Sequence, residues 1–137
     1  MRFTSALVLA GGLAACTTDR ADVYGTDWSG AATMNAYPSV ALHDQVAGLV
    51  VLQCRVEDGL RVDHCVAIHE NPPGHGFAEA AIRLKDGVIV RSQPVTVGDT
   101  VYFSVPFCFD DRSCERVRGE ASALRARFNE TGELPTP

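Results

Sequence analysis

The chain has 137 residues, 46% of them hydrophobic, and carries a formal net charge of -5. This length suits one small domain with a modest core. The acidic balance excludes nucleic-acid binding, or binding to an anionic lipid surface, by bulk positive charge.

Residues 1–15 have the pattern of a bacterial lipoprotein signal peptide. Arg2 precedes an apolar run over residues 6–13, which is too short to span a bilayer as a mature helix. Small alanines stand directly before Cys16, so we expect cleavage there and a lipid anchor on the Cys16 thiol. The alternative is an ordinary secretory signal with a chance cysteine. Thr17 in place of aspartate after the lipidated residue predicts the outer membrane, with the protein facing the periplasm.

The segment between the anchor and the domain consists mostly of small and polar residues. Residues 17–36 show no helical or strand period, which predicts a flexible linker over residues 16–36. Tyr37 and Pro38 then begin a short helix that Gly48 ends. This helix is predicted to place three apolar residues on one face: Val40, Ala41 and Val46.

A β-hairpin is predicted next. Residues 49–56 are apolar and β-branched, Asp58 and Gly59 favour a turn, and residues 60–68 alternate apolar and polar. A two-residue turn would place Cys54 opposite Asp63, one diagonal step from Cys65. Two readings stay open: both faces of the hairpin are covered, or a bulge near the turn shifts the alternation.

The four cysteines that remain besides Cys16 form two local pairs, Cys54 with Cys65 and Cys108 with Cys114. In an exported chain this number predicts two disulfides, although four cysteines allow three pairings. The metal alternative uses the histidines of the hairpin, but His64 and Cys65 are neighbours that point to opposite faces of a strand. We therefore expect no metal site and no cofactor.

The second half of the domain is predicted to contain a helix and a strand. Residues 77–85 have apolar side chains at helical spacing, residues 88–98 mix strand and turn chemistry, and residues 100–109 form a strongly apolar strand. Pro106 cannot donate to a strand ladder, so this strand lies at an edge or ends there.

The chain is predicted to end in an amphipathic helix over residues 115–128, followed by a frayed end from residue 130. Its apolar stripe consists of Val117, Ala121, Leu124 and Phe128. Charged residues lie mostly off this stripe: Arg116, Arg118, Glu120, Arg125 and Arg127. The loop over residues 110–113, between two cysteines, either presents a recognition surface or ties the strand to the helix.

Several segments form a pattern by their order and spacing: residues 37–41, 48–56, 58–59, 65–66 and 73–81. This pattern resembles the C-terminal domain of TonB-like energy transducers, above all variants with a cysteine on each hairpin strand. The resemblance covers about residues 37–107. It implies an α+β fold, with a small antiparallel sheet from the hairpin and a later strand, two helices, and here an additional C-terminal amphipathic helix. The domain would span residues 37–109, followed by the disulfide loop and helix over residues 110–137.

The resemblance also implies a binding mode. Domains of this family grip an extended peptide of an outer-membrane receptor by adding it as a strand to an exposed edge. By position, that edge is the strand over residues 100–107, with the peptide beside Thr100, Tyr102 and Ser104. Tyr37 and Pro38 match the family's Tyr-Pro start and would pack next to the peptide.

The chain departs from a full transducer at its start. A transducer keeps an uncleaved transmembrane helix and a long proline-rich span, whereas this sequence predicts a cleaved signal and a linker of about twenty residues. We therefore expect a protein-binding module connected with TonB-dependent transport, without force transfer between membranes. The sequence has no nucleophile elbow and no carboxylate pair, so we expect neither an enzyme nor a small-molecule substrate. The alternative is a structural envelope lipoprotein whose binding edge the helix over residues 115–128 covers permanently.

Overall fold

The computed structural model describes residues 23–24, 30–88, 90 and 95–134. The predicted signal peptide and Cys16 lie outside the described residues. The described elements, in chain order, are the following: β1 (Val23–Tyr24), α1 (Gly30–Asn35), α2 (Ser39–His43), β2 (Gly48–Glu57), η1 (Asp58–Leu60), β3 (Arg61–Asn71), α3 (Phe77–Arg83), η2 (Leu84–Gly87), β4 (Thr100–Phe107) and α4 (Asp111–Thr131).

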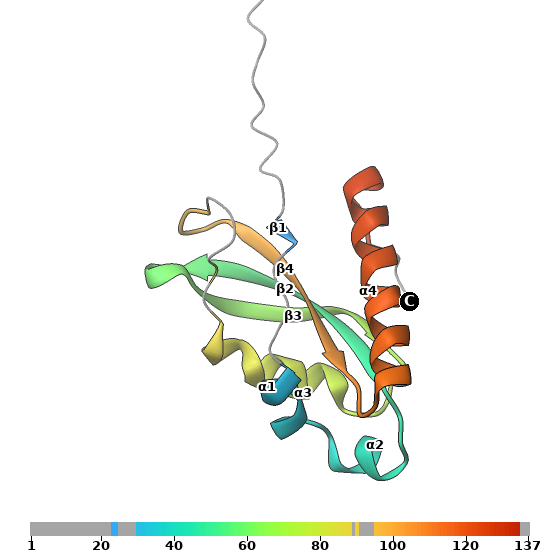
Figure 1. Cartoon of the computed structure of the whole chain (residues 1–137). Helices are drawn as coiled ribbons and strands as arrows, with labels where there is room; N and C mark the ends of the chain where they lie inside the picture. The colour runs from blue at the N-terminus through green and yellow to red at the C-terminus, as the bar shows by residue number, and fades with distance from the viewer. Residues whose placement is uncertain (1–22, 25–29, 89, 91–94, 135–137) are drawn as a thin grey trace, which may run out of the picture.

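The architecture is α+β, as the sequence predicts. The sheet has the strand order β1-β4-β2-β3 (Figure 1). β2 pairs antiparallel with β3 on one side and with β4 on the other, so β2 is the central strand. The two-residue β1 lies parallel to β4, beside Val101 and Tyr102. Within the described ranges, no helix is long and apolar enough to cross a membrane.

The hairpin of β2 and β3 has features of both open readings: a bulge shifts its pairing, and both faces are covered at the start of β2. The turn has three residues, with Gly59 at a φ of 72°, rather than the predicted two. The pairing shifts by one residue around Cys54, so that two residues of β3, His64 and Cys65, face it. His64 has a φ of 50°, which marks the bulge. This extra residue brings Cys65 opposite Cys54, where the two form the predicted disulfide.

The larger core fills one face of the sheet. β2 and β4 contribute alternate residues to it, and α3 contributes Phe77, Ala80 and Ala81, as its helical spacing predicts. Gly48, the first residue of β2, allows α3 to approach closely, because a Cβ there would lie 2.5 Å from Phe77 Cε2.

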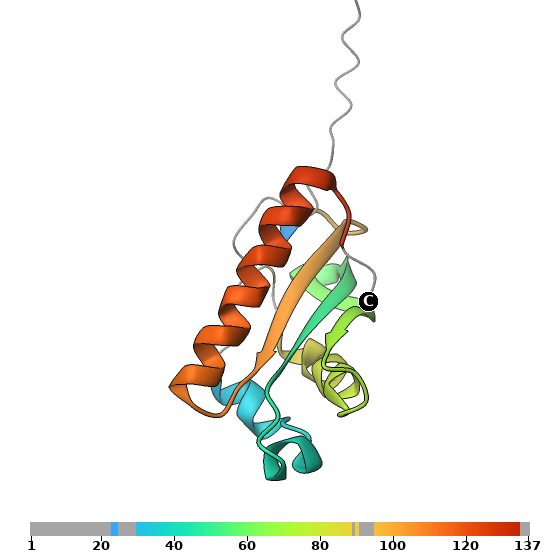
Figure 2. The same ribbon diagram turned by 90° about the vertical axis from the view of Figure 1, so that its right-hand side faces the viewer.

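α4 covers the opposite face, so the sheet lies between α3 and α4 (Figure 2). Its predicted stripe is confirmed for Val117, Leu124 and Phe128, which are buried, while Ala121 is half-buried. Val117 and Leu124 pack with Leu49 and Val51 of β2. Five consecutive residues at the start of β2 are buried, because both of its faces are covered there.

Several local predictions were wrong. β1 and α1 lie in the segment that was predicted to have no helix or strand. Val40 is 66% exposed, because α2 ends at His43 and turns only Ala41 into the core. Gly48 belongs to a strand and does not end a helix. The last helix continues to Thr131, past the predicted frayed end, and is closed by Gly132 at a φ of 70°.

Candidate functional site

Hydrogen bonds at the start of β4, the predicted edge strand, show which way its backbone N–H and C=O groups point. Val56 N–H donates to the Asp99 carbonyl at 2.8 Å, and the Val56 carbonyl accepts from Gly98 N–H at 2.8 Å. Both backbone groups of Val56 therefore point toward β4. Because backbone groups alternate in direction along a strand, those of Cys54 and Leu52 also point toward β4.

The backbone groups of the β4 residues that pair with these β2 residues point toward β2. Cys54 pairs with Val101, Leu52 with Phe103 and Val50 with Val105, without a register shift. The backbone groups of the intervening β4 residues consequently point away from β2, toward the outer side of the sheet. These residues are Thr100, Tyr102, Ser104 and Pro106. Pro106 has no N–H, so its position in this outward set leaves the β2–β4 ladder intact.

A glycine bulge sets this alternation at the start of β4. Gly98 has a φ of 92°, a conformation that L side chains rarely adopt, and together with Asp99 it faces the single residue Val56. The Asp99 carboxylate accepts from Thr96 N–H at 2.9 Å, which closes the preceding turn. The turn therefore determines which β4 residues face outward.

The two faces of β4 differ in their surroundings. Phe103, Val105 and Phe107 are buried in the core with α3, whereas Tyr102 packs with α4. The Tyr102 ring lies 4.9 Å from the Phe128 ring, centroid to centroid. Ser104 is on the same face as Tyr102 and is buried.

A groove runs between this face of β4 and one flank of α4. It has a volume of about 370 Å³ and is lined by Ser104, Pro106, Arg118, Ala121, Ser122 and Arg125. None of these lining residues is acidic. The opposite flank of α4 lies toward β3, where Glu120 Oε1 accepts from Asn71 Nδ2 at 2.8 Å and lies 3.4 Å from His69 Nε2. This contact orients the helix, so that Arg118 and Arg125 face the β4 side.

The structure places Tyr37 and Pro38 apart from the outward residues of β4. The Tyr37 ring packs edge-on against Phe77 and Phe107, on the α3 face of the sheet. Its hydroxyl donates to the Val46 carbonyl at 2.7 Å, and burial raises the pKa of Tyr37 to about 12. Pro38 precedes the first turn of α2. Tyr37 thus fixes the segment before β2 against the core.

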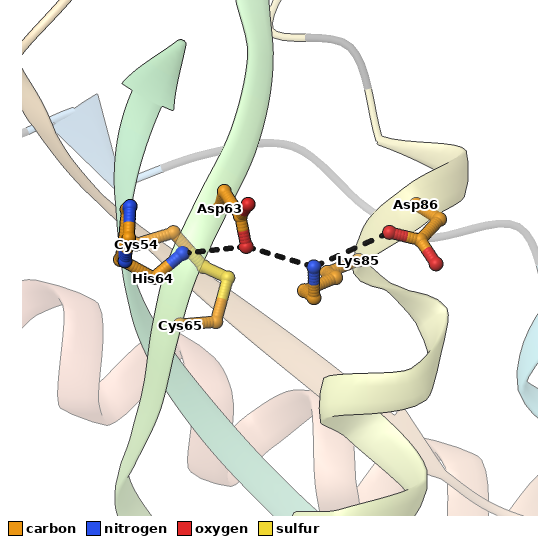
Figure 3. Close-up of a disulfide and its surroundings, with 6 residues drawn as sticks. All are labelled: Cys54, Asp63, His64, Cys65, Lys85 and Asp86. Atoms are coloured by element: carbon orange, nitrogen blue, oxygen red, sulfur yellow. Dashed lines mark hydrogen bonds and ion pairs between the residues drawn. A yellow bond between two sulfur atoms is a disulfide. The ribbon is translucent and has the colours of Figure 1, made fainter.

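The hairpin disulfide lies beside a small charged network (Figure 3). The Lys85 ammonium donates to the Asp63 carboxylate at 2.8 Å and lies 3.3 Å from Asp86. The bond from Lys85, and then that from His64 N–H, lower the pKa of Asp63. This network joins β3 to η2, which directly follows α3.

The second predicted disulfide, Cys108 with Cys114, is also confirmed. The segment between these cysteines starts α4 and is not a free loop. Asp110 is the N-cap: its carboxylate accepts from Ser113 N–H at 2.7 Å, and Ser113 Oγ accepts from Asp110 N–H at 3.1 Å. The hydrogen bonds from Ser113 lower the pKa of the Asp110 carboxyl. The structure therefore favours the reading in which this segment ties β4 to α4.

Thr100, Tyr102 and Ser104 were predicted on one strand, and the structure brings them together at its outer side. Arg118, Ser122 and Arg125 were not predicted to lie next to that strand. Their spacing along α4 was visible, but the flank that faces β4 depends on how the helix docks. No protein-family model and no curated protein matches the chain. The resemblance to TonB C-terminal domains therefore stays a proposal.

Proposed function

We propose that this chain is a non-enzymatic envelope lipoprotein, anchored through a lipid on Cys16, whose domain binds an extended peptide of a partner protein. The peptide adds as a strand at the outer side of β4. The partner we favour is an outer-membrane receptor of TonB-dependent transport, on the residue pattern that resembles TonB C-terminal domains.

The observation that carries this proposal is the outward direction of the backbone groups of Thr100, Tyr102 and Ser104, with the two-residue β1 paired to part of this row. Strand addition requires a row of N–H and C=O groups directed away from the rest of the sheet. β4 also contains no charged side chain, and charged residues are a common protection of an edge.

The other edge of the sheet is less suited to a peptide. β3 has two register shifts against β2, which break the regular spacing of its backbone groups. It also carries charged or titratable side chains along its length: Arg61, Asp63, His64, His69 and Glu70. Bulges and charges of this kind discourage strand pairing.

A second candidate function has support from β1. This short strand already pairs with β4 at Val101 and Tyr102. If β1 stays in place, the chain itself covers this part of β4, which favours a structural role for the domain. The predicted cover by the C-terminal helix is less favoured, because the buried residues of α4 pack on the face of the sheet.

Proline substitution tests the proposal. Ser104→Pro removes an outward N–H and leaves the hydrogen bonds between β2 and β4 intact. We expect loss of partner binding with a retained fold, measured by circular dichroism and by co-purification of the receptor from detergent-solubilised membranes.

Two matched variants control for other effects of this change. Ser104→Ala removes the hydroxyl but keeps the N–H, so it should bind like the wild type. Val105→Pro removes an inward N–H and should destabilise the sheet. Unchanged receptor binding by Ser104→Pro would rule out strand addition at β4.

A further inference from the structure

We infer that the groove between β4 and α4 selects an acidic peptide, whose carboxylates bind Arg118 and Arg125. This inference rests on the proposed strand addition and specifies the chemical class of the peptide. Its starting point is the position of the groove, which opens beside the same strand whose outward backbone groups would hold the peptide.

The charge of the groove differs from that of the whole chain. The chain is acidic, with 17 Asp and Glu against 12 Lys and Arg, yet the two charged residues that line this groove are both arginines. Arg118 is exposed and has no carboxylate partner among the described residues, whereas Arg125 already takes part in an interaction that a peptide carboxylate would share or replace. A guanidinium group binds a carboxylate through two parallel hydrogen bonds, so an acidic ligand matches it in charge and in shape.

The spacing of the two arginines fits a strand. Arg118 and Arg125 are separated by seven residues, which is about 10.5 Å along a helix. Side chains on one face of a strand repeat every ~6.7 Å, so acidic residues two or four positions apart in the peptide lie within reach of two flexible arginine side chains. Since α4 returns along β4 after a short connection, helix and added strand would run side by side (Figure 2).

The neighbouring side chains complete the arrangement. Ser122 lies between the two arginines on the same flank of the helix and adds a hydroxyl donor. Ala121 and Pro106 are small or flat and leave room for a side chain that enters from the added strand. In this arrangement the backbone of β4 provides affinity for any extended peptide, and the arginines provide preference for an acidic one.

A peptide selection tests the inference. The full chain, purified in detergent, is used to select binders from a random peptide library displayed on phage. We expect the enriched sequences to carry aspartate or glutamate at alternate positions. One enriched peptide is then synthesised together with its amide counterpart, in which each acid is replaced by glutamine or asparagine, and both are titrated by fluorescence anisotropy.

Charge reversal on α4 identifies the site. Arg118→Glu should lower the affinity for the acidic peptide by about tenfold or more and leave the affinity for the amide peptide nearly unchanged. Arg127→Glu makes the same charge change on the opposite flank of the same helix and should change the affinity by less than about twofold.

The possible failures are distinguishable. Enriched peptides without acidic residues, or equal effects of Arg118→Glu and Arg127→Glu, would overturn the acidic preference and leave strand addition standing. Absence of any enriched peptide would instead contradict the proposed function itself. Binding that Ser104→Pro does not weaken would place the peptide away from β4 and overturn both.

Discussion

At the scale of single residues, two glycines have roles that their backbone or surroundings require. Gly98 adopts a positive φ in the bulge that sets the alternation of β4. Gly48 has no room for a side chain, because Phe77 occupies the space where its Cβ would lie. Both were visible in the sequence as glycines, but only the position of Phe77 and the bulge explains why glycine is needed.

Gly48→Ala should destabilise the domain by about 1–3 kcal/mol, because the new Cβ would overlap with the buried Phe77 ring. Urea denaturation of the full chain measures this loss. Gly119→Ala is the matched control, since a Cβ at that exposed helical position meets no atom within 4 Å. A Gly48→Ala protein as stable as the wild type would show that the ring can move aside.

The raised pKa of Tyr37 should make the stability of the domain depend on pH in the alkaline range. Burial raises the pKa of its phenol from 10.0 to about 12, so the folded state holds this proton more tightly than the unfolded state. The stabilisation is complete below pH 10 and is lost as the pH rises toward 12. Denaturation across this window should show the fall in unfolding free energy.

Tyr37→Phe should reduce that dependence on pH. It also removes the hydrogen bond to the Val46 carbonyl, at a cost of about 1 kcal/mol below pH 10. An equally steep loss of stability in wild type and Tyr37→Phe would assign the alkaline effect to other groups.

At the scale of elements, the hairpin, α3, β4 and α4 could be predicted because each has a clear period. The apolar stripe of α4 and the spacing of Phe77, Ala80 and Ala81 belong to this group. A bulge near the turn was one of two open readings, but its position at His64 could not be predicted, because the disulfide fixes a register that the alternation of β3 does not contain. β1 and α1 were missed because their short sequences have no apolar period.

We expect β1 to compete with a partner peptide for the outer side of β4. Because it occupies Val101 and Tyr102, a partner peptide must displace it to pair along the whole strand. Replacing both Val23 and Tyr24 by proline removes the backbone donors of β1. The affinity for an enriched peptide should then rise by roughly two- to tenfold, as measured by anisotropy.

The matched control replaces Val23 and Tyr24 by alanine, which keeps both backbone N–H groups. It should bind more weakly than the proline pair. A fall in affinity on proline substitution would mean that β1 forms part of the peptide site and does not compete for it.

At the scale of the whole molecule, the two sides of the sheet are unlike. β3 forms one edge and is bulged and charged. On the other side only the two-residue β1 lies outside β4, which is apolar, regular and flanked by the arginines of α4. The fold class was predictable from the order of the elements. The candidate site was predictable only as a strand, since its direction and its flanking groove arise from contacts between distant segments.

The most direct measurement is photo-crosslinking in cells from a probe that replaces Thr100, whose backbone groups face outward. The captured peptides are identified by mass spectrometry of the membrane fraction. We predict crosslinks to one extended segment of an outer-membrane protein, and their loss in Ser104→Pro. Crosslinks only to the chain's own β1 or α4, unchanged by that substitution, would contradict strand addition and favour the structural alternative.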